Sequence, residues 1–318
     1  MIESGAAYAE LSRNLARRLD APDEFAALTR ACAQLLSQTG QHRPPVSLKS
    51  IGRALGIEYE YEKAAAGNEE ASLSFSDGRM RLHISRNRFR SNPRRARFSI
   101  AHEMAHVILI RALGPGAIDA GESDRASYEA VERLCDFAAS HLLLPREQLA
   151  AALRERGIGR GGTWALTTLF EVSQEALFRS IADLVPDGSV LLWRRYRRNA
   201  REDLTWRVWG SYTPLHAISN RPWLPRGCTL KHLAIGHLLD HAEPDRAVLA
   251  RDVELQLNGP VTRHDLVATR WSDSYRQISM DGVSEASRGR PQEFTSDCLV
   301  TVLGRKDRVD PRLFQARS

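Results

Sequence analysis

Apolar residues recur at helical spacing along the first part of the chain. They fall every four residues from Ala7 to Leu19 and continue from Phe25 to Leu36, which predicts amphipathic helices. The segment Gln38–Pro45, with one glycine and two prolines, then predicts a linker. We therefore expect a helical arm over residues 1–40. This arm can dock on the rest of the chain or exchange with a second copy, which would give a homodimer.

The pattern changes after the linker. A short helix is predicted from Leu48 to Leu55, and the alternation of apolar and acidic residues from Ile57 to Tyr61 predicts a strand. Two more apolar stretches flank Asp77 and Gly78. This pair favours a hairpin, because a type I′ turn needs positive φ at both central residues. A small sheet is therefore expected in this part of the chain.

A mostly apolar helix, predicted around residues 97–110, contains an H-E-x-x-H pattern at His102, Glu103 and His106. Residues four apart in a helix lie on the same side, so both imidazoles can share one metal ion. Glu103 lies on the adjacent face, where it can reach a metal-bound water but not the metal itself. Unpaired buried polar groups are costly, and a metal would explain their presence. The alternative is a helix with two half-buried histidines and no metal.

A second helix, predicted from Glu129 to Pro145, offers further ligands. Its apolar stripe is accompanied by an acidic face that carries Glu129, Glu132 and Asp136. One carboxylate, Glu132, can bind the metal while Asp136, one turn on, orients a ligating imidazole through its other nitrogen. A solvated acidic face is the alternative. The loop between the two helices also contains acidic residues that could compete as ligands: Asp119, Glu122 and Asp124.

The segment R-F-S-I-A-H-E-M-A-H followed by E-R-L-C-D-F-A-A-S-H-L-L-L-P resembles the ImmA/IrrE family of zinc metallopeptidases, and the resemblance extends over Pro45–Pro145. It implies three ligands for Zn2+, with Mn2+ as the alternative ion: His102, His106 and Glu132. It also implies that Glu103 is the general base. Asp136 stands where many relatives have Asn, and Asp accepts an imidazole N–H at least as well.

The same resemblance implies an endopeptidase with a narrow range of protein substrates. In this family the substrate is often a helix-turn-helix transcriptional repressor, cleaved in response to stress or to induction of a mobile element. The resemblance also implies that the hairpin before the metal helix offers its edge strand to an extended peptide. A donor that stabilises the oxyanion should exist as well. His83 and Tyr128 are candidates that the sequence does not distinguish.

Residues 164–184 form a helix-turn-helix pattern. Two apolar helical segments are separated by Glu171-Val172-Ser173, in which Ser173 is a good N-cap. A DNA-binding unit would place its base-reading side chains early in the second helix, where Glu175 would face phosphates unfavourably. Packing of this unit against the peptidase core is therefore favoured over DNA binding.

The composition changes after Pro186-Asp187-Gly188, and a second domain is expected there. We predict an α+β domain that is sensor-like or protein-binding, and some relatives carry a GAF-like domain at this place. A helix is predicted from Leu230 to His241. Strands are predicted at residues 190–193, 204–209, 253–257, 266–271 and 298–303, with a turn at 258–260.

The predicted fold class is α+β, with four successive parts. These are the helical arm (1–40), a mainly helical, zincin-like peptidase core with a small sheet (41–150), the helix-turn-helix-like segment (151–186) and the C-terminal domain (187–318).

Charge and cysteine content add few constraints. The 318 residues carry a net charge of +6, mostly from arginine, which suits an acidic or nucleic-acid partner without requiring one. Arg86–Arg97 holds six arginines, either a basic rim on the cleft or a solvated surface. No apolar run suits a transmembrane helix, and the first residues lack a secretory signal. Four dispersed cysteines favour a cytoplasmic protein with reduced thiols and no membrane partner.

Two other classes of protein stay open. One is a DNA- or signal-binding regulator whose metal site is structural or lost. The helix-turn-helix pattern, the basic balance and the arginine-rich segment Arg194–Arg201 favour this class. The other is a toxin or antitoxin partner with a peptidase fold. A second histidine pair, His237 and His241, could hold a metal, but Leu238 takes the place of the glutamate.

Overall fold

The computed structural model describes residues 4–62, 70–114, 125–186, 188–197, 205–214, 247–256, 261–271, 293–305 and 309–314. The chain divides into two compact units. The first consists of residues 1–148 and 168–176, and the second of residues 149–167 and 177–318. Both units combine helices with a sheet, which confirms the α+β class. The predicted domain boundaries at residues 40, 150 and 186 stay predictions.

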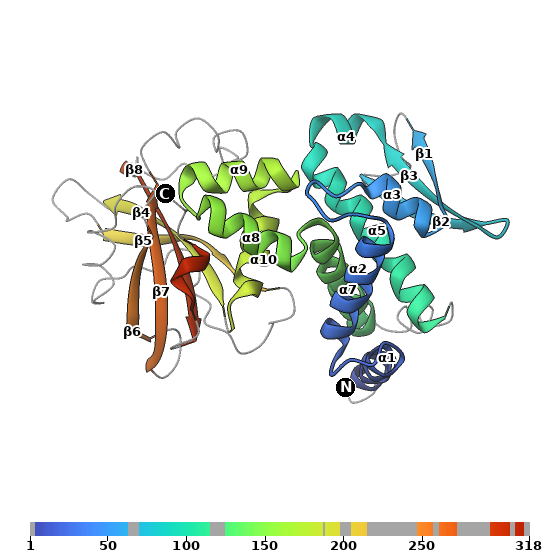
Figure 1. Cartoon of the computed structure of the whole chain (residues 1–318), viewed down its shortest axis with the longest axis horizontal. Coiled ribbons are helices and arrows are strands. Elements are labelled where there is room, and N and C mark those ends of the chain that lie inside the picture. The colour runs from blue at the N-terminus through green and yellow to red at the C-terminus, as the bar shows by residue number, and fades with distance from the viewer. Residues whose placement is uncertain are drawn as a thin grey trace. The chain divides into compact units, whose positions relative to one another are not determined.

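The N-terminal arm consists of α1 (Ser4–Arg18) and α2 (Glu24–Gln38), as its apolar spacing predicts (Figure 1). Asp23 caps α2 by accepting a hydrogen bond from the backbone N–H of Ala26 at 2.7 Å. The arm packs on α5 (Pro93–Leu113) and α7 (Arg125–Leu143) of the same unit, and Leu15 is fully buried there. The arm therefore docks on its own chain.

A three-stranded sheet follows the short helix α3 (Leu48–Ala54). Its order is β1-β3-β2, in which β1 (Ile57–Glu62) runs parallel to β3 (Arg79–Ser85) and β2 (Ala71–Ser76) runs antiparallel to β3. At the β2–β3 turn, Asp77 and Gly78 have φ values of 53° and 71°. The hairpin thus has the two positive φ angles that its sequence predicts.

The strand register sorts the side chains of this sheet onto two different faces, because successive residues of a strand point to opposite sides. One face is apolar and contributes four buried side chains to the core: Ile57, Ala71, Leu82 and Ile84. The other face, called here the polar face, carries glutamates on β1, basic residues on β3 and serines on β2. Ion pairs join the β1 and β3 rows: Glu58 with Arg79 and Arg81, and Glu60 with Arg81. His83 Nδ1 lies 3.3 Å from Glu60 Oε2 and 2.8 Å from Glu62 Oε1.

Helix α5 carries the H-E-x-x-H pattern, and its start is fixed by local sequence. Asn92 accepts a hydrogen bond from the backbone N–H of Arg95 at 3.2 Å, and Pro93 occupies the first turn, where its missing N–H has no partner to lose. The helix α4 (Arg86–Ser91) precedes it, and Gly114, with φ of 94°, ends it. Apolar residues of α5 are buried on both sides of the pattern, from Ala96 to Leu109. They fix α5 against α7, so the polar residues between them lie at a helix–helix contact.

Helix α8 (Arg146–Arg156) is followed by α9 (Arg160–Phe170) and α10 (Gln174–Leu184), which confirm the predicted pair of helices. Glu171, with φ of 54°, forms the turn, and Ser173 Oγ accepts a hydrogen bond from the backbone N–H of Ala176 at 3.1 Å. This turn lies in the first unit, where Glu171 Oε2 is 3.1 Å from Arg97 Nη1 of α5. The turn is therefore tied to the helix that carries the H-E-x-x-H pattern.

The second unit contains a five-stranded antiparallel sheet of order β5-β4-β8-β7-β6. All five strands overlap predicted ones: β4 (Ser189–Arg197), β5 (Thr205–Tyr212), β6 (Val248–Gln256), β7 (Val261–Trp271) and β8 (Glu293–Arg305). The short 3₁₀ helix η3 (Pro311–Leu313) follows them. The comparison with a GAF-like domain stays a prediction.

Tryptophans hold the core of this second unit together. Trp271 is buried, donates from Nε1 to the carbonyl of Ile158 at 3.1 Å and lies 6.2 Å from Phe178 between ring centroids. Trp193 is also buried and donates from Nε1 to Thr301 Oγ1 at 2.8 Å. Each indole N–H is therefore paired inside the core, as buried aromatic residues require.

Some predicted features lie outside the described residues. They are the acidic loop with Asp119, Glu122 and Asp124, the end of the arginine-rich segment at 198–201, the helix Leu230–His241 with its two histidines, and the turn at 258–260. Among the described helices, none has the length and apolar character needed to cross a lipid bilayer.

A test of the first unit concerns the contact between α3 and β1. A Cβ on Gly52 would clash with the hydroxyl and ring of Tyr59, and this hydroxyl donates to the carbonyl of Leu48 at 2.7 Å. We expect Gly52→Ala to lower the free energy of unfolding by about 1–3 kcal/mol, because the rigid ring must move. Denaturant titration of Gly52→Ala, Tyr59→Leu and the double variant would measure this. In the Tyr59→Leu background, Gly52→Ala should lower the free energy of unfolding much less than it does in the unmodified chain. Additive changes in the double variant would contradict the clash.

Candidate metal centre

The predicted site residues come from two helices of the first unit. His102, Glu103 and His106 lie on α5, and Glu132 and Asp136 lie on α7. Helical spacing places His102 with His106 on one side of α5, and Glu132 with Asp136 on one side of α7. Because α5 packs against α7, the two sets meet although 25 residues lie between them in sequence.

The two helices share a chain of close polar contacts. His102 Nδ1 lies 2.8 Å from Asp136 Oδ1, and His102 Nε2 lies 3.1 Å from Glu132 Oε2. His106 Nε2 lies 3.4 Å from the other oxygen of Glu132, Oε1. The two imidazole rings are 5.0 Å apart between centroids and inclined at 70°. The structure therefore brings together all four residues that were predicted as ligands or ligand support.

This donor set suits the metal that the sequence predicts. Two imidazole nitrogens and one carboxylate are among the ligand sets that catalytic zinc sites use. Asp136 engages Nδ1 of His102, which leaves Nε2 of the same ring directed at Glu132. A carboxylate behind a ligating histidine is the usual way in which the ring is oriented. The residues present therefore fit zinc: Glu132 supplies a carboxylate ligand, and Asp136 orients the ligating ring of His102.

The charges of the pair His102 and Glu132 are set by their contacts. Burial lowers the pKa of His102, but hydrogen bonds and charge interactions with Asp136 and Glu132 outweigh it and raise this pKa to about 10. Hydrogen bonds from His102 and His106 lower the pKa of Glu132 to about 2. Near neutral pH, these shifts favour a protonated His102 hydrogen-bonded to Glu132 and Asp136. A metal must displace that proton.

Glu103, the predicted general base, is partly buried on α5 beside His102. Its charge helps to raise the pKa of the Cys135 thiol, after the larger effects of burial, Glu132 and Asp136. Glu103 is therefore close enough to act electrostatically on the same group of residues.

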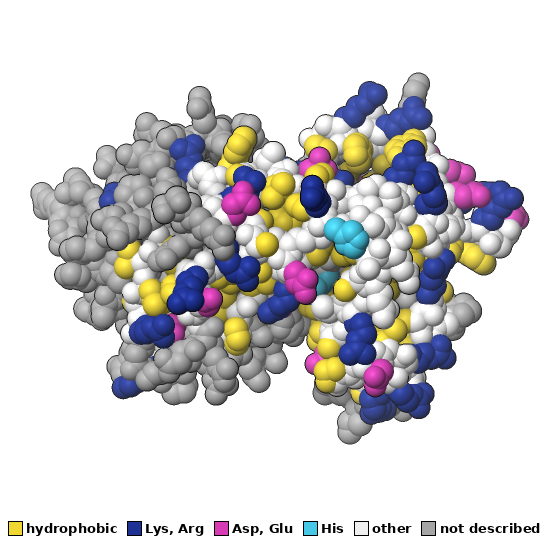
Figure 2. All heavy atoms as spheres, viewed as in Figure 1, with side chains coloured by type: hydrophobic (Ala, Val, Ile, Leu, Met, Phe, Trp, Pro, Cys, Tyr) yellow, Lys and Arg dark blue, Asp and Glu magenta, His cyan; other side chains and the backbone are white. Residues whose placement is uncertain are grey.

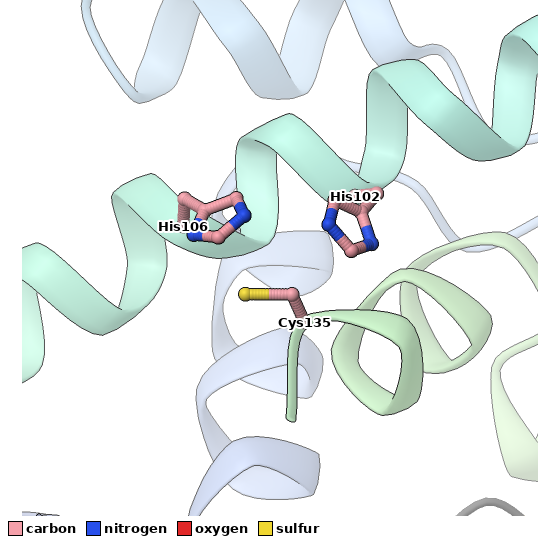
Figure 3. A group of neighbouring side chains, drawn as sticks. All are labelled: His102, His106 and Cys135. Carbon is pink, nitrogen blue, oxygen red and sulfur yellow. The ribbon is translucent and has the colours of Figure 1, made fainter. Parts of the chain in front are cut away.

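Cys135 belongs to this group, although its sequence context predicts only a core residue. It is fully buried, and one donor atom from each of His102, His106 and Cys135 lies within 4.8 Å of the others. Figure 3 shows the thiol reaching from α7 toward the two imidazoles of α5. Cys135 follows Glu132 by three residues, and Asp136 follows it by four. This spacing alone could have placed Cys135 on the ligand side of the helix. Its apolar neighbours concealed this position.

The alternative metal ligand Glu129 and the two candidate oxyanion donors, Tyr128 and His83, make none of the polar contacts of His102 and His106 described above. Glu129 is exposed at the start of α7. Tyr128 is 51% exposed. His83 lies on the polar face of the small sheet, where Nδ1 is 2.8 Å from Glu62 Oε1 and Nε2 is 2.7 Å from Ser74 Oγ. Both ring nitrogens of His83 are engaged there, so the structure assigns it to the sheet surface. The oxyanion donor stays unassigned.

The arginines of Arg86–Arg97 are partly used in structural ion pairs. Arg95 Nε is 3.0 Å from Glu70, and Arg97 donates to the carbonyl of Val46 at 2.9 Å in addition to its pair with Glu171. In Figure 2, the lysine and arginine side chains visible on the first unit are scattered rather than gathered in one patch. This segment therefore resembles a solvated, partly ion-paired surface more than a continuous basic rim.

Comparison with known proteins agrees with the geometry. Residues 53–181 match the family model of the IrrE N-terminal-like domain, Peptidase M78. This segment is therefore a domain of the IrrE-like Peptidase M78 family, which confirms the resemblance to ImmA/IrrE proteins. It includes the three-stranded sheet, α5 and α7.

One solved structure is similar over most of the chain. It is described as a Mycobacterium tuberculosis transcriptional regulator, with 15% identity and a TM-score of 0.44, covering 94% of this chain and 81% of that chain. No match was found among curated proteins.

The third ligand can be tested by metal content. Loss of even a group behind a ligand lowers metal affinity by about 10- to 100-fold, so Glu132→Ala should weaken zinc binding at least that much. The matched control is Glu129→Ala, one turn earlier and exposed, which should bind zinc as the unmodified chain does. Elemental analysis and competition with a chelator would measure both. Zinc retained in Glu132→Ala but lost in Glu129→Ala would reassign the ligand.

The charge state of His102 can be tested by proton release. Because its pKa is raised to about 10, zinc binding at pH 8 should release about one proton from it, whereas an unperturbed histidine would release almost none. This proton alone should raise the apparent affinity for zinc by about tenfold per pH unit between pH 7 and 9. Calorimetry in buffers of different ionisation enthalpy would count the protons.

The Asp136→Asn variant provides the comparison for this experiment. It removes one of the charges that raise the pKa of His102, so proton release at pH 8 should decrease. Glu129→Gln should leave it unchanged. Equal proton release in all three proteins would show that Asp136 does not set the charge of His102.

Proposed function

We propose that the chain is a zinc-dependent endopeptidase that cuts a protein substrate at specific sites. The observation that carries this proposal is the contact between α5 and α7. There, Glu132 meets His102 and His106 through different oxygens, and Asp136 holds the other side of His102. This arrangement lies within the Peptidase M78 domain.

In the proposed reaction, His102, His106 and Glu132 hold the metal. When bound, zinc supplies a Lewis acid that polarises the peptide carbonyl and makes water a better nucleophile. Asp136 keeps the proton of His102 on Nδ1, so that Nε2 is free to bind. Glu103 accepts a proton from the attacking water on its carboxylate and delivers it to the nitrogen of the leaving amine. Mn2+ is the alternative ion.

The proposed substrate is a helix-turn-helix transcriptional repressor, cut in a cytoplasmic stress or mobile-element response. The support for this choice is the sequence resemblance to ImmA/IrrE proteins, together with the IrrE N-terminal-like domain at residues 53–181. The β2–β3 hairpin would contribute an edge strand for an extended segment of that substrate.

A second candidate function is a DNA- or signal-binding regulator with a structural metal. The paired helices α9 and α10, with Ser173 capping the second, favour it. Such a regulator would be retained on generic DNA, with the logarithm of its affinity falling linearly with the logarithm of salt concentration. The peptidase does not require this behaviour.

The variant Glu103→Gln tests the proposed reaction. It replaces the base by a neutral side chain of the same shape, so cleavage should fall by about 100- to 10,000-fold, while zinc content should stay that of the unmodified chain. Purified repressors from the same genome, incubated with the zinc-loaded chain and examined by mass spectrometry, would reveal the cut. Glu129→Gln, the same exchange at an exposed position of α7, is the matched control. Cleavage undiminished in Glu103→Gln would refute the mechanism.

A further inference from the structure

Cys135 is the group near the metal helices for which the proposed reaction has no use. It lies on α7 three residues after Glu132 and one residue before Asp136, both of which contact His102. Its side chain is fully buried and has no disulfide partner. Free cysteine packs as a small apolar residue in many protein cores, so only its neighbours can assign a chemical role to this thiol.

The surroundings of the thiol are those of a metal donor. Donor atoms of His102, His106 and Cys135 lie mutually within 4.8 Å. Figure 3 shows the two rings on one side and the sulfur facing them from the neighbouring helix. Zinc binds thiolate and imidazole together in many protein sites. The side-chain movement needed to bring these three donors onto one ion is therefore small compared with the length of the side chains.

The other buried thiol in the described residues provides a comparison. Cys32 on α2 is also fully enclosed, but its sulfur donates to the carbonyl of Ala138 at 3.6 Å. It is not part of the histidine group. Burial alone therefore does not distinguish Cys135, whereas its position facing the two imidazoles does.

We propose that the Cys135 thiolate is a further donor to the resting metal centre, beside His102, His106 and Glu132. This proposal rests on the metal site of the proposed function. On binding, the S–H bond breaks, a metal–sulfur bond forms and the proton leaves to solvent, so no oxidant or reductant is required. Four protein donors satisfy tetrahedral zinc and leave no open position. The resting centre is then closed, and withdrawal of the sulfur opens the position that peptide hydrolysis needs.

Cobalt provides a direct spectroscopic test. Metal-free full-length protein is titrated with Co2+, which adopts zinc-like coordination and shows a thiolate-to-metal charge-transfer band in the near ultraviolet when sulfur is bound. The unmodified chain and Cys32→Ser should show this band. Cys135→Ser should still bind Co2+ but lose the band, with affinity lowered at least about tenfold, since even groups behind ligands contribute that much.

A second measurement covers the case in which Cys135→Ser does not fold. X-ray absorption of the zinc-loaded protein should show sulfur among the ligands. The sulfur signal should persist when Cys32, Cys228 and Cys298 are all replaced by serine, because Cys135 alone then supplies it. This experiment leaves Cys135 itself unchanged.

The outcomes separate this proposal from the proposed function. Metal bound with only nitrogen and oxygen ligands would overturn the role of Cys135 and leave the peptidase site intact. A band that persists in Cys135→Ser would also overturn it. Failure of the unmodified chain to bind Co2+ or zinc at all would overturn both.

Discussion

The contact between α5 and α7 imposes the main constraint on this protein. Two helices that are largely apolar meet where they carry two imidazoles and two carboxylates. Charged groups at such a contact are tolerated only when they are paired and hydrogen-bonded. Here each contact joins a ring nitrogen to a carboxylate oxygen, and one carboxylate serves both rings. The apolar residues on either side fix the helices, and the polar residues between them are held at 2.8–3.4 Å.

Much of this arrangement could be predicted because it depends on local spacing. Residues four apart share a helix face, which places His102 with His106 and Glu132 with Asp136. The Asp77-Gly78 turn also depends on local backbone preference, and alternation in β1 determines which side chains face the core. The N-cap Ser173 marks the start of α10 for the same reason. In each case the structural feature is determined by residues within a few positions of it in the sequence.

Other features depend on contacts between distant segments. Cys135 has apolar neighbours in sequence, and only the packing of α7 on α5 turns its sulfur toward the histidines. His83 is near the metal helix in sequence, yet the parallel register of β1 and β3 pairs it with Glu60 and Glu62. Glu171 lies in a predicted turn, but its pairing with Arg97 joins segments more than 70 residues apart. Spacing rules contain no information on such pairs.

The ionised pair of His102 and Glu132 has a consequence for how the chain matures. Hydrogen bonds and charge attraction between these two side chains stabilise the contact of α5 with α7. Many small metalloproteins instead need the ion in order to fold at all. In this chain, an ion competes with a contact that already joins α5 and α7, because the proton on His102 must leave first. Loading of the centre is therefore an exchange of a proton for an ion, and acid favours the proton.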